Sequence, residues 1–203
     1  MGYLIVAILA YLVGCSNMAV YLAKLRNVDL KNGSGNPGTS NATILMGWGA
    51  GVLVGIHDIG KGILAVLLAE LAFPQIPYIG AVAGVACVLG HIFPAFMKFK
   101  GGKGFASFIG MTVALNWKFA LIILAVVVIV TLITDYLVVG TVTMVVATPV
   151  VVGILAHSVL LAVIICVATA VILYRHRENY TKIRNGTEIG LRSAAKGKHR
   201  VKQ

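Results

Sequence analysis

Three lysines set around a pair of glycines form the segment of this sequence that is best suited to binding an anion. The segment runs from Gly90 to Gly104 and ends in Lys-Phe-Lys-Gly-Gly-Lys-Gly. Lysine ammonium groups are compact positive charges, and glycines expose backbone amides, so the pattern suits phosphate. An ordinary basic loop on the inner side of a membrane has a similar composition. The paired glycines favour the phosphate site, and its candidates are His91, Lys100, Gly101, Gly102, Lys103 and Gly104.

A second candidate segment, residues 32–41, is rich in Gly, Asn and Ser. Exposed amides and short polar side chains can converge on an anion. A helix predicted to begin near Ala42–Leu45 would point its positive end at the same place. A flexible turn between two helices explains the composition equally well. The candidate residues here are Gly33, Ser34, Gly35, Asn36, Gly38 and Asn41.

A third segment, Tyr174–Tyr180, places two arginines around a histidine. Arginines grip phosphate, and histidine exchanges protons near neutral pH. The alternative is a belt of arginines that caps the last membrane helix, because cations favour helix C-termini. The candidate residues are Arg175, His176, Arg177 and Asn179.

Two ionisable residues lie inside an apolar run. Asp58 and Lys61 are three positions apart, so they share a helix face and are predicted to pair. Charged groups at membrane depth are functional candidates, and a structural ion pair is an equally fair interpretation. We therefore assign them a supporting role.

The elements that must position these residues are membrane helices. The chain has 203 residues, of which 59% are apolar and 11% charged, whereas soluble domains carry about 25% charged residues. This composition excludes a soluble globule, a disordered chain and a nucleic-acid-binding domain. It predicts an all-α, polytopic integral membrane protein with about seven transmembrane helices, the fourth of them short. The seven apolar runs are 3–22, 45–72, 78–97, 105–116, 119–134, 136–154 and 156–174.

The distribution of basic residues predicts the orientation in the membrane. The net charge is +11, and 15 of the 17 Lys and Arg residues lie in segments 23–44, 98–104 and 175–203. These segments share the inner side if the N-terminus is outside and the C-terminus is cytoplasmic, as the positive-inside rule requires. Topology and anionic substrates account for the excess charge, and no nucleic-acid partner is predicted.

In this order and spacing, the motifs resemble the bacterial acyl-phosphate:glycerol-3-phosphate acyltransferases of the PlsY type. The resemblance rests on Gly33–Asn41, Asp58–Gly62, Gly90–Gly104 and Tyr174–Asn179, and it extends to about Glu188. It implies a seven-span enzyme of the bacterial cell membrane with its motifs on the cytoplasmic side. The implied domains are a membrane-embedded acyltransferase domain, 1–188, and a basic cytoplasmic tail, 189–203.

The implied reaction transfers a fatty acyl group from acyl phosphate to the 1-hydroxyl of glycerol 3-phosphate. The product is lysophosphatidic acid for phospholipid synthesis. The implied partners are these two substrates and membrane lipids, with no cofactor or metal, in a monomer or homodimer. By position, Ser34, Lys103, His176 and Asn179 would be catalytic, while the glycine loops would cradle the acyl phosphate. The donor's own phosphate, His176 or, in second place, His91 would take the hydroxyl proton.

One departure from the family pattern leaves the acceptor open. The family usually has an arginine where this chain has Ile44, and losing one arginine–phosphate contact costs about 1.5–3 kcal/mol. A weaker affinity for glycerol phosphate, or a divergent paralogue with another phosphorylated acceptor, would follow. A transporter of a small organophosphate or anion is the alternative that Asp58 and Lys61 suggest.

Overall fold

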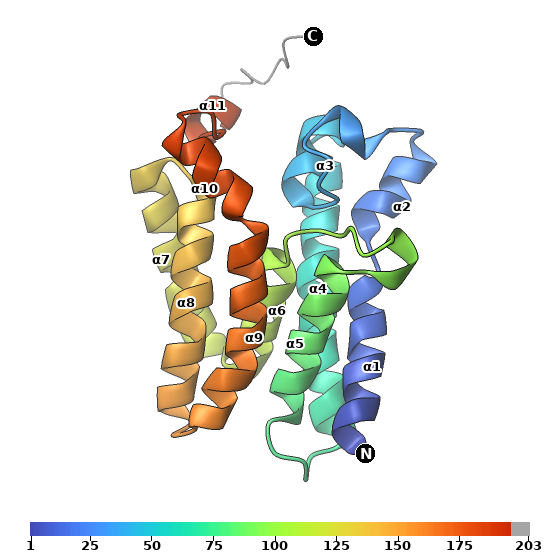
Figure 1. Ribbon diagram of the computed structural model, residues 1–203, viewed down its shortest axis with the longest axis vertical. Helices are drawn as coiled ribbons and strands as arrows, with labels where there is room; N and C mark the ends of the chain where they lie inside the picture. Colours follow the sequence, from blue (N-terminus) through green and yellow to red (C-terminus); the bar gives the residue numbers. More distant parts are fainter. Residues whose placement is uncertain (196–203) are drawn as a thin grey trace.

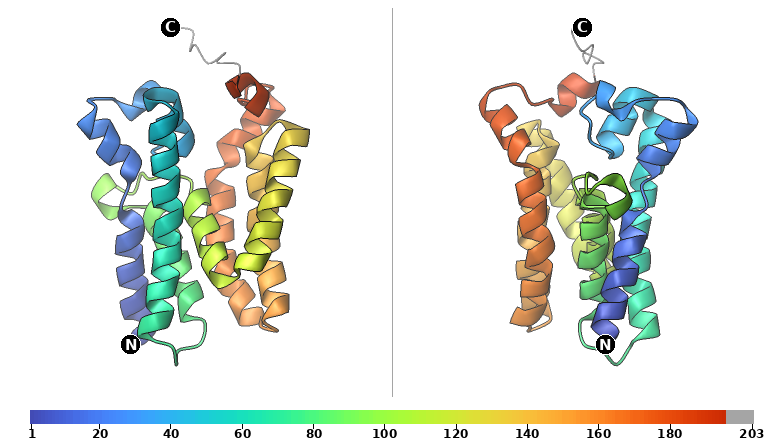
Figure 2. Two further views of the ribbon diagram at one scale, coloured as in Figure 1. Left: turned by 180° about the vertical axis from the view of Figure 1, so that it is seen from behind. Right: turned by 45° about the vertical axis from the view of Figure 1, so that its right-hand side comes forward.

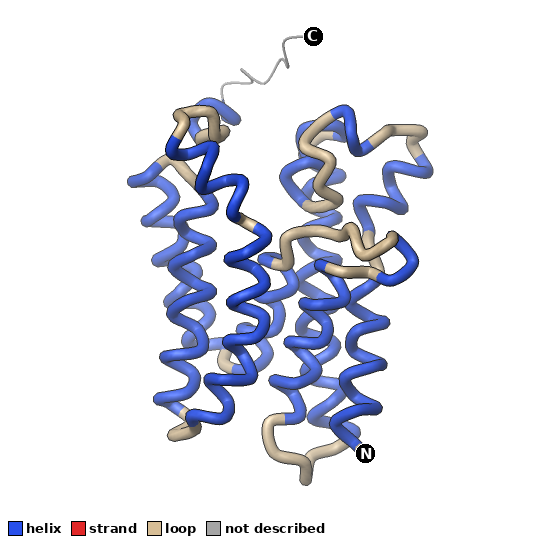
Figure 3. Tube along the Cα trace, viewed as in Figure 1, coloured by secondary structure: helices blue, strands red, loops and turns tan. Residues whose placement is uncertain are grey.

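The computed structural model describes residues 1–195, and all regular elements in that part of the chain are helices (Figure 3). The prediction of an all-α protein is therefore confirmed. The helices before the fourth apolar run are α1 (Gly2–Cys15), α2 (Met18–Leu25), η1 (Leu30–Asn32), α3 (Thr39–Met46), α4 (Trp48–Ala72), α5 (Ile79–Ile92) and η2 (Ala95–Met97). The remaining helices are α6 (Phe105–Leu115), α7 (Trp117–Thr134), α8 (Leu137–Leu155), α9 (Val159–Arg175), α10 (Arg177–Arg184) and α11 (Leu191–Ala195).

The apolar runs of the sequence correspond to helices, most of which are long enough to cross a membrane. Within residues 1–195, five helical segments are long and apolar enough to span a membrane, or six if α9 and α10, which are bent by 44° to each other, form one span. Helix α6 has 11 residues, too few to cross a hydrocarbon core of about 30 Å, so the short fourth run is confirmed. The total of seven spans stays a prediction, as do the sides on which the termini lie.

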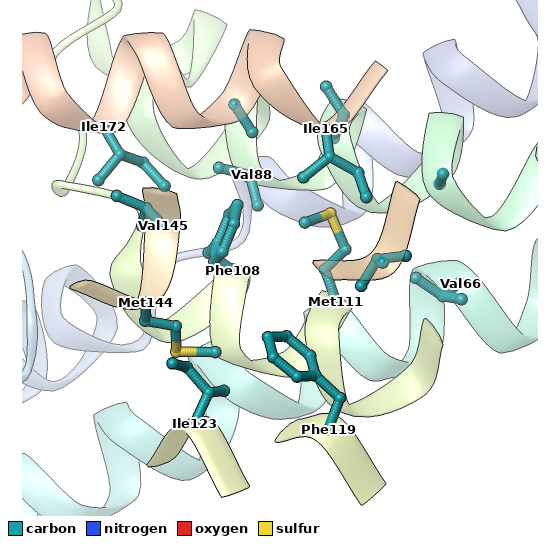
Figure 4. Close-up of a cluster of buried hydrophobic side chains, with 14 of the residues drawn as sticks. Val66, Val88, Phe108, Met111, Phe119, Ile123, Met144, Val145, Ile165 and Ile172 are labelled. Atoms are coloured by element: carbon teal, nitrogen blue, oxygen red, sulfur yellow. The ribbon is translucent and has the colours of Figure 1, made fainter. Parts of the chain in front are cut away.

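The helices form two groups that meet at α5 and α6. Helix α1 packs against α5, and α4 packs against both α5 and α6. In the other group α8 packs between α7 and α9, while α5–α9 and α6–α7 contacts join the halves (Figures 1 and 2). A cluster of buried apolar side chains, which includes Phe108, Met111, Met144 and Ile165, fills this junction (Figure 4).

Close helix packing depends on glycine where α4 crosses α6. A Cβ atom on Gly62 would lie 2.3 Å from the Ser107 carbonyl oxygen, and one on Gly110 would lie 2.0 Å from that of Ile59. Neither position tolerates a side chain without moving a backbone. Small residues that let helices approach are typical of membrane interfaces.

A proline inside α8 is compensated from the neighbouring helix. Pro149 has no N–H, so the Val145 carbonyl lacks its usual helical donor. The Thr169 hydroxyl of α9 donates to that carbonyl at 2.8 Å. Unpaired backbone groups are costly in an apolar medium, so this bond supports the α8–α9 contact.

Candidate active site

The three polar segments lie toward one end of the bundle. The Gly-rich loop before α3, the loop of residues 98–104 and the α9–α10 bend lie toward the end that carries α3 and α11, opposite the N-terminus (Figures 1 and 2). The 98–104 loop runs from η2 back to α6 beside α9. Segments far apart in sequence are thus brought to one region, as the charge pattern predicts.

A chain of hydrogen bonds joins the 98–104 loop to α10 and the segment after it. The Lys103 ammonium donates to Asn179 Oδ1 at 2.5 Å. Asn179 Nδ2 in turn donates to Glu188 Oε1 at 2.6 Å. The carboxylate accepts only, so it fixes the Asn179 amide with its oxygen toward Lys103. Two predicted catalytic residues are therefore in direct contact, and Glu188 orients one of them.

Lys103 is partly withdrawn from water. Burial lowers the pKa of its ammonium group below the usual value, and the Glu188 carboxylate opposes that shift. A desolvated ammonium group held by one amide oxygen retains two donors. It can therefore contact an anion strongly.

Arg175, at the end of α9, also reaches the 98–104 loop. Its Nη2 donates to the Gly101 carbonyl at 3.2 Å, while its Nε is buried and has no hydrogen-bond partner among residues 1–195. Arg177 instead lies over the Tyr174 ring, 4.1 Å from the ring centroid, and donates to the Tyr174 carbonyl at 3.2 Å. Arg175 thus joins Lys103 at the loop, and Arg177 caps the helix end.

His176 occupies the bend between α9 and α10 and is buried. Its Nδ1 lies 2.8 Å from the Ile172 carbonyl, which can only accept, so Nδ1 carries the proton. In the neutral ring Nε2 is then an acceptor. Lys103 and Arg175 are the charged groups that act on the ring. His176 is suited to accepting a hydrogen bond or proton beside the cations.

The predicted cradle of free amides is not formed in the Gly33–Gly38 loop. The amide of Ser34 donates to Asn41 Oδ1 at 2.8 Å, that of Gly35 to the Leu30 carbonyl, and that of Gly38 to the Asn36 carbonyl. Asn41 Nδ2 also donates to Leu30 at 2.9 Å, so both ends of this buried side chain hold the loop. The exposed Ser34 side chain is the group this loop presents.

The start of the following helix also differs from the prediction near Ala42–Leu45. Helix α3 begins at Thr39, with Gly38 as its N-cap. The polar residues Thr39, Ser40 and Asn41 are typical of a loop, but they form the first turn of α3. The Asn41 side chain there donates to the Leu30 carbonyl of the preceding segment.

The glycines of the second loop serve close packing rather than an amide cradle. Gly101 and Gly102 donate their amides to the carbonyls of Ile92 and His91 at 3.0 and 3.1 Å. A Cβ atom on Gly102 would lie 2.1 Å from His91 Nε2. Gly104 has a φ of 90° and caps α6, a conformation that favours glycine. Lys100 is exposed, so side chains supply the positive charge at this loop.

The predicted pairing of Asp58 with Lys61 is confirmed. Lys61 Nζ lies 2.8 Å from Asp58 Oδ1, and both side chains are buried in α4. His91 Nδ1 lies 2.8 Å from the same ammonium, and the Ser16 carbonyl accepts from it at 2.7 Å. His91 therefore faces the ion pair, while the Gly102 backbone covers its other nitrogen.

Several positioning residues were not found from the sequence. Asn17 caps α2 and donates to the Pro37 carbonyl at 3.1 Å, which ties the α1–α2 break to the Gly-rich loop. An Asn before a helical run is an N-cap signal, but its second contact is not local. Asp135 Oδ1 accepts from the Arg192 amide at 2.8 Å, four positions after Glu188 in the chain. No spacing rule links those positions.

The predicted basic tail, 189–203, is only partly within the described residues. Its first part docks on the α7–α8 turn, where the Leu191 amide donates to the Asp135 carbonyl at 2.8 Å. Residues 196–203 lie outside the described part of the chain. Within residues 1–195, no group of three or more His, Cys, Asp or Glu side chains is placed to hold a metal ion.

Comparison with known proteins identifies the family. The profile described as glycerol-3-phosphate acyltransferase matches residues 4–186. The chain belongs to the glycerol-3-phosphate acyltransferase family. This acyltransferase is 34% identical to glycerol-3-phosphate acyltransferase 1 of Oceanobacillus iheyensis, over 95% of this chain and 97% of the relative. It is 36% identical to the glycerol-3-phosphate acyltransferase of Thermoanaerobacter sp. strain X514, over 91% and 93% of the two chains.

The fold of this acyltransferase is also that of a solved relative. It superposes with a TM-score of 0.88 on the crystal structure of PlsY (YgiH), an integral membrane glycerol 3-phosphate acyltransferase, in its glycerol 3-phosphate form. The match covers 96% of this chain and 98% of PlsY at 34% identity. The chain is therefore a multi-pass membrane enzyme of this family.

Proposed function

We propose that this enzyme transfers a fatty acyl group from acyl phosphate to the 1-hydroxyl of glycerol 3-phosphate, giving lysophosphatidic acid for phospholipid synthesis. The observation that carries the proposal is the meeting of Lys103, Asn179 and Arg175 at one loop. The reaction brings two phosphates together, so it needs cations at one place. The buried Nε of Arg175, which has no partner in the described part of the chain, is a donor that an anion would satisfy.

The substrates supply the reactive groups, and the protein holds them. The hydroxyl oxygen forms an ester bond with the acyl carbonyl carbon. The bond from that carbon to the phosphate oxygen breaks, and phosphate leaves with the electron pair. The hydroxyl proton ends on the released phosphate. Positioning and neutralisation of charge account for catalysis without a covalent enzyme intermediate.

We assign roles from the contacts of each side chain. Lys103 and Arg175 contact phosphate, with the exposed Lys100 at the rim. Asn179 directs Lys103. His176 Nε2 accepts a hydrogen bond from the reacting hydroxyl or relays its proton to the phosphate.

The Gly-rich loop takes part through Ser34, whose hydroxyl is free to donate to the acceptor. Gly33, Gly35, Asn36 and Gly38 shape the loop, and Asn41 holds it. His91 is a poor proton acceptor here, because Lys61 occupies Nδ1 and Gly102 covers Nε2.

The orientation follows the charge distribution. Segments 23–44, 98–104 and 175–203 hold 15 of the 17 basic residues, so we place that end in the cytoplasm of the bacterial cell and the N-terminus outside. Glycerol 3-phosphate and acyl phosphate would then reach the site from the inner face. A monomer or homodimer is compatible with a site built within one chain.

The alternatives rest on two features. Charged residues at membrane depth suggest a transporter of a small organophosphate or anion. The Lys61 ammonium, however, has three protein partners, so a structural role accounts for its place in the membrane. A different phosphorylated acceptor is suggested by Ile44, which lies 44% exposed on α3 and offers no donor to phosphate. The acceptor therefore needs a direct test.

Purified enzyme in detergent or liposomes should be given acyl phosphate with a panel of phosphorylated acceptors. We expect acylation of glycerol 3-phosphate, and loss of turnover in Lys103→Ala. Turnover with another acceptor alone would refute the assigned acceptor. Lack of transfer from acyl phosphate to every acceptor would refute the reaction.

A further inference from the structure

The buried ammonium of Lys61 is a junction of three helical segments. It contacts Asp58 of its own helix at 2.8 Å, the Ser16 carbonyl at the α1–α2 break at 2.7 Å, and His91 Nδ1 of α5 at 2.8 Å. An ammonium group has three donors, so all are used. Lys61 consequently has no donor left for a substrate, although it lies at membrane depth.

One arm of this junction leads to the Gly33–Gly38 loop. Ser16 provides the carbonyl that Lys61 holds, and Asn17 is the next residue. The Asn17 side-chain oxygen caps α2, and its amide donates to the Pro37 carbonyl at 3.1 Å. Asn17 is buried, so this bond is shielded from water. A displacement of the α1–α2 break would therefore also displace the Gly33–Gly38 loop, which presents Ser34.

The other arm leads to the 98–104 loop. The His91 ring faces Lys61, and its backbone carbonyl accepts from the Gly102 amide at 3.1 Å. Gly102 lies so close to the ring that a Cβ would be 2.1 Å from Nε2. Lys103, the predicted catalytic cation, is the next residue. A shift of the His91 ring would therefore move Lys103.

The junction is electrically balanced. The Asp58 carboxylate offsets the Lys61 charge, and its Oδ1 also lies 3.4 Å from His91 Nδ1. Opposite charges that pair with each other and have further polar partners are the form in which ionisable groups persist inside a membrane protein. Such a cluster sets fixed distances between the segments that it joins.

We infer that Lys61 is a positioning residue that sets the distance between the two substrate-binding loops, Gly33–Gly38 and Gly101–Lys103. The inference rests on the proposed function, in which these loops hold acceptor and donor. Correct spacing would align the acceptor hydroxyl with the acyl carbonyl. A misplacement of about 1 Å can lower a rate about 100-fold.

The main variant removes both charges together. Asp58→Asn/Lys61→Met leaves no unpaired buried charge, which is the usual cause of misfolding after a single substitution. We expect kcat per folded enzyme to fall about 10-fold to 100-fold, with the Kd for glycerol 3-phosphate within about threefold of wild type. Asn17→Ser keeps a capping oxygen but loses the bond to Pro37, and we expect a smaller fall in kcat.

Thr169→Val is the matched control for lost stability. It removes a buried hydrogen bond between α9 and Val145 of α8 that involves no residue of either loop. We expect a lower Tm and unchanged kcat. An unchanged kcat per folded enzyme in the double variant would overturn the inference and leave Lys61 a merely structural role. A rise in Kd with kcat unchanged at saturation would instead make Lys61 a substrate ligand, and would also overturn it.

A distance measurement tests the inference without turnover. Spin labels on cysteines at the exposed positions Asn32 and Lys98, in an otherwise cysteine-free background, report the separation of the loop regions by pulsed electron paramagnetic resonance. We expect a narrow distribution in wild type and a broader or shifted one in the double variant. Identical distributions would overturn the inference. Absence of turnover in wild type would refute the proposed reaction and leave this readout valid.

Discussion

The contact between Asn179 and Glu188 gives the sharpest test of how the site is held. Asn179 Nδ2 donates to Glu188 at 2.6 Å, and its oxygen faces Lys103. Hydrogen bonds to charged groups are worth about 1.5–3 kcal/mol, and Glu188 is half-buried, so the lower part of that range applies. Glu188→Ala frees the amide to rotate and place its NH₂ group against Lys103. We expect kcat/KM to fall about 10-fold to 30-fold.

Glu188→Gln distinguishes the effect of the negative charge at residue 188 from the effect of its hydrogen bond to Asn179. Glutamine retains an acceptor oxygen but forms a neutral bond, which is weaker by about 1 kcal/mol and lowers kcat/KM about fivefold. Glu178→Gln removes the same charge from an exposed position on α10 and is the control, with an expected change under about twofold. Initial rates of lysophosphatidic acid formation measure all three. Wild-type activity in Glu188→Ala, or equal losses in the two glutamine variants, would refute the reasoning.

Four further predictions concern other parts of the structure. Because burial lowers the pKa of Lys103, kcat/KM should fall as pH rises, with an apparent pKa below the usual 10.5 of lysine. If kcat/KM of Lys103→Arg falls over the same pH range, the titrating group is not Lys103. Ile44→Arg should lower the KM for glycerol 3-phosphate about 10-fold or more, and an unchanged KM would contradict the missing-contact argument. Gly102→Ala should cost about 1–3 kcal/mol of stability and most activity, as thermal unfolding and turnover assays would report, whereas Gly49→Ala, with nothing within 4 Å, should cost neither. Asp135→Gly suits a φ of 69° but removes the carboxylate that accepts from the Arg192 amide, while the bond from the Leu191 amide to the backbone carbonyl stays. Hydrogen exchange at Arg192 should therefore accelerate and kcat/KM should fall about fivefold, and unchanged exchange would contradict the docking role of the Asp135 side chain.

Much of the fold could be predicted because a membrane imposes simple rules. Apolar runs must become helices when no water is present to satisfy the backbone. A single residue separates the sixth apolar run, 136–154, from the seventh, 156–174, so their boundary is poorly marked in the sequence. The structure ends α8 at Leu155 and starts α9 at Val159, where Ser158 caps the helix. Because the run that contains Asp58 and Lys61 must be helical, their spacing of three residues also predicts that they pair.

The site could be predicted only as separate motifs. Composition indicates Lys103, and the family resemblance indicates Asn179, but their contact joins positions 76 residues apart, which no local pattern encodes. The predicted cradle of free glycine amides is wrong, because the sequence does not show whether a backbone amide already has a partner, as that of Gly102 has in the His91 carbonyl. Glu188 lay at the end of the motif region, and only its position beside Asn179 reveals its role.

The reaction itself is tested most directly by its stoichiometry. Purified enzyme, acyl phosphate and glycerol 3-phosphate can be followed in one sample by phosphorus NMR, with Lys103→Ala in parallel. The account predicts one inorganic phosphate for each lysophosphatidic acid formed, and neither product above background in the variant. Phosphate release without acylation of glycerol 3-phosphate, or acylation that requires a thioester donor in place of acyl phosphate, would contradict it.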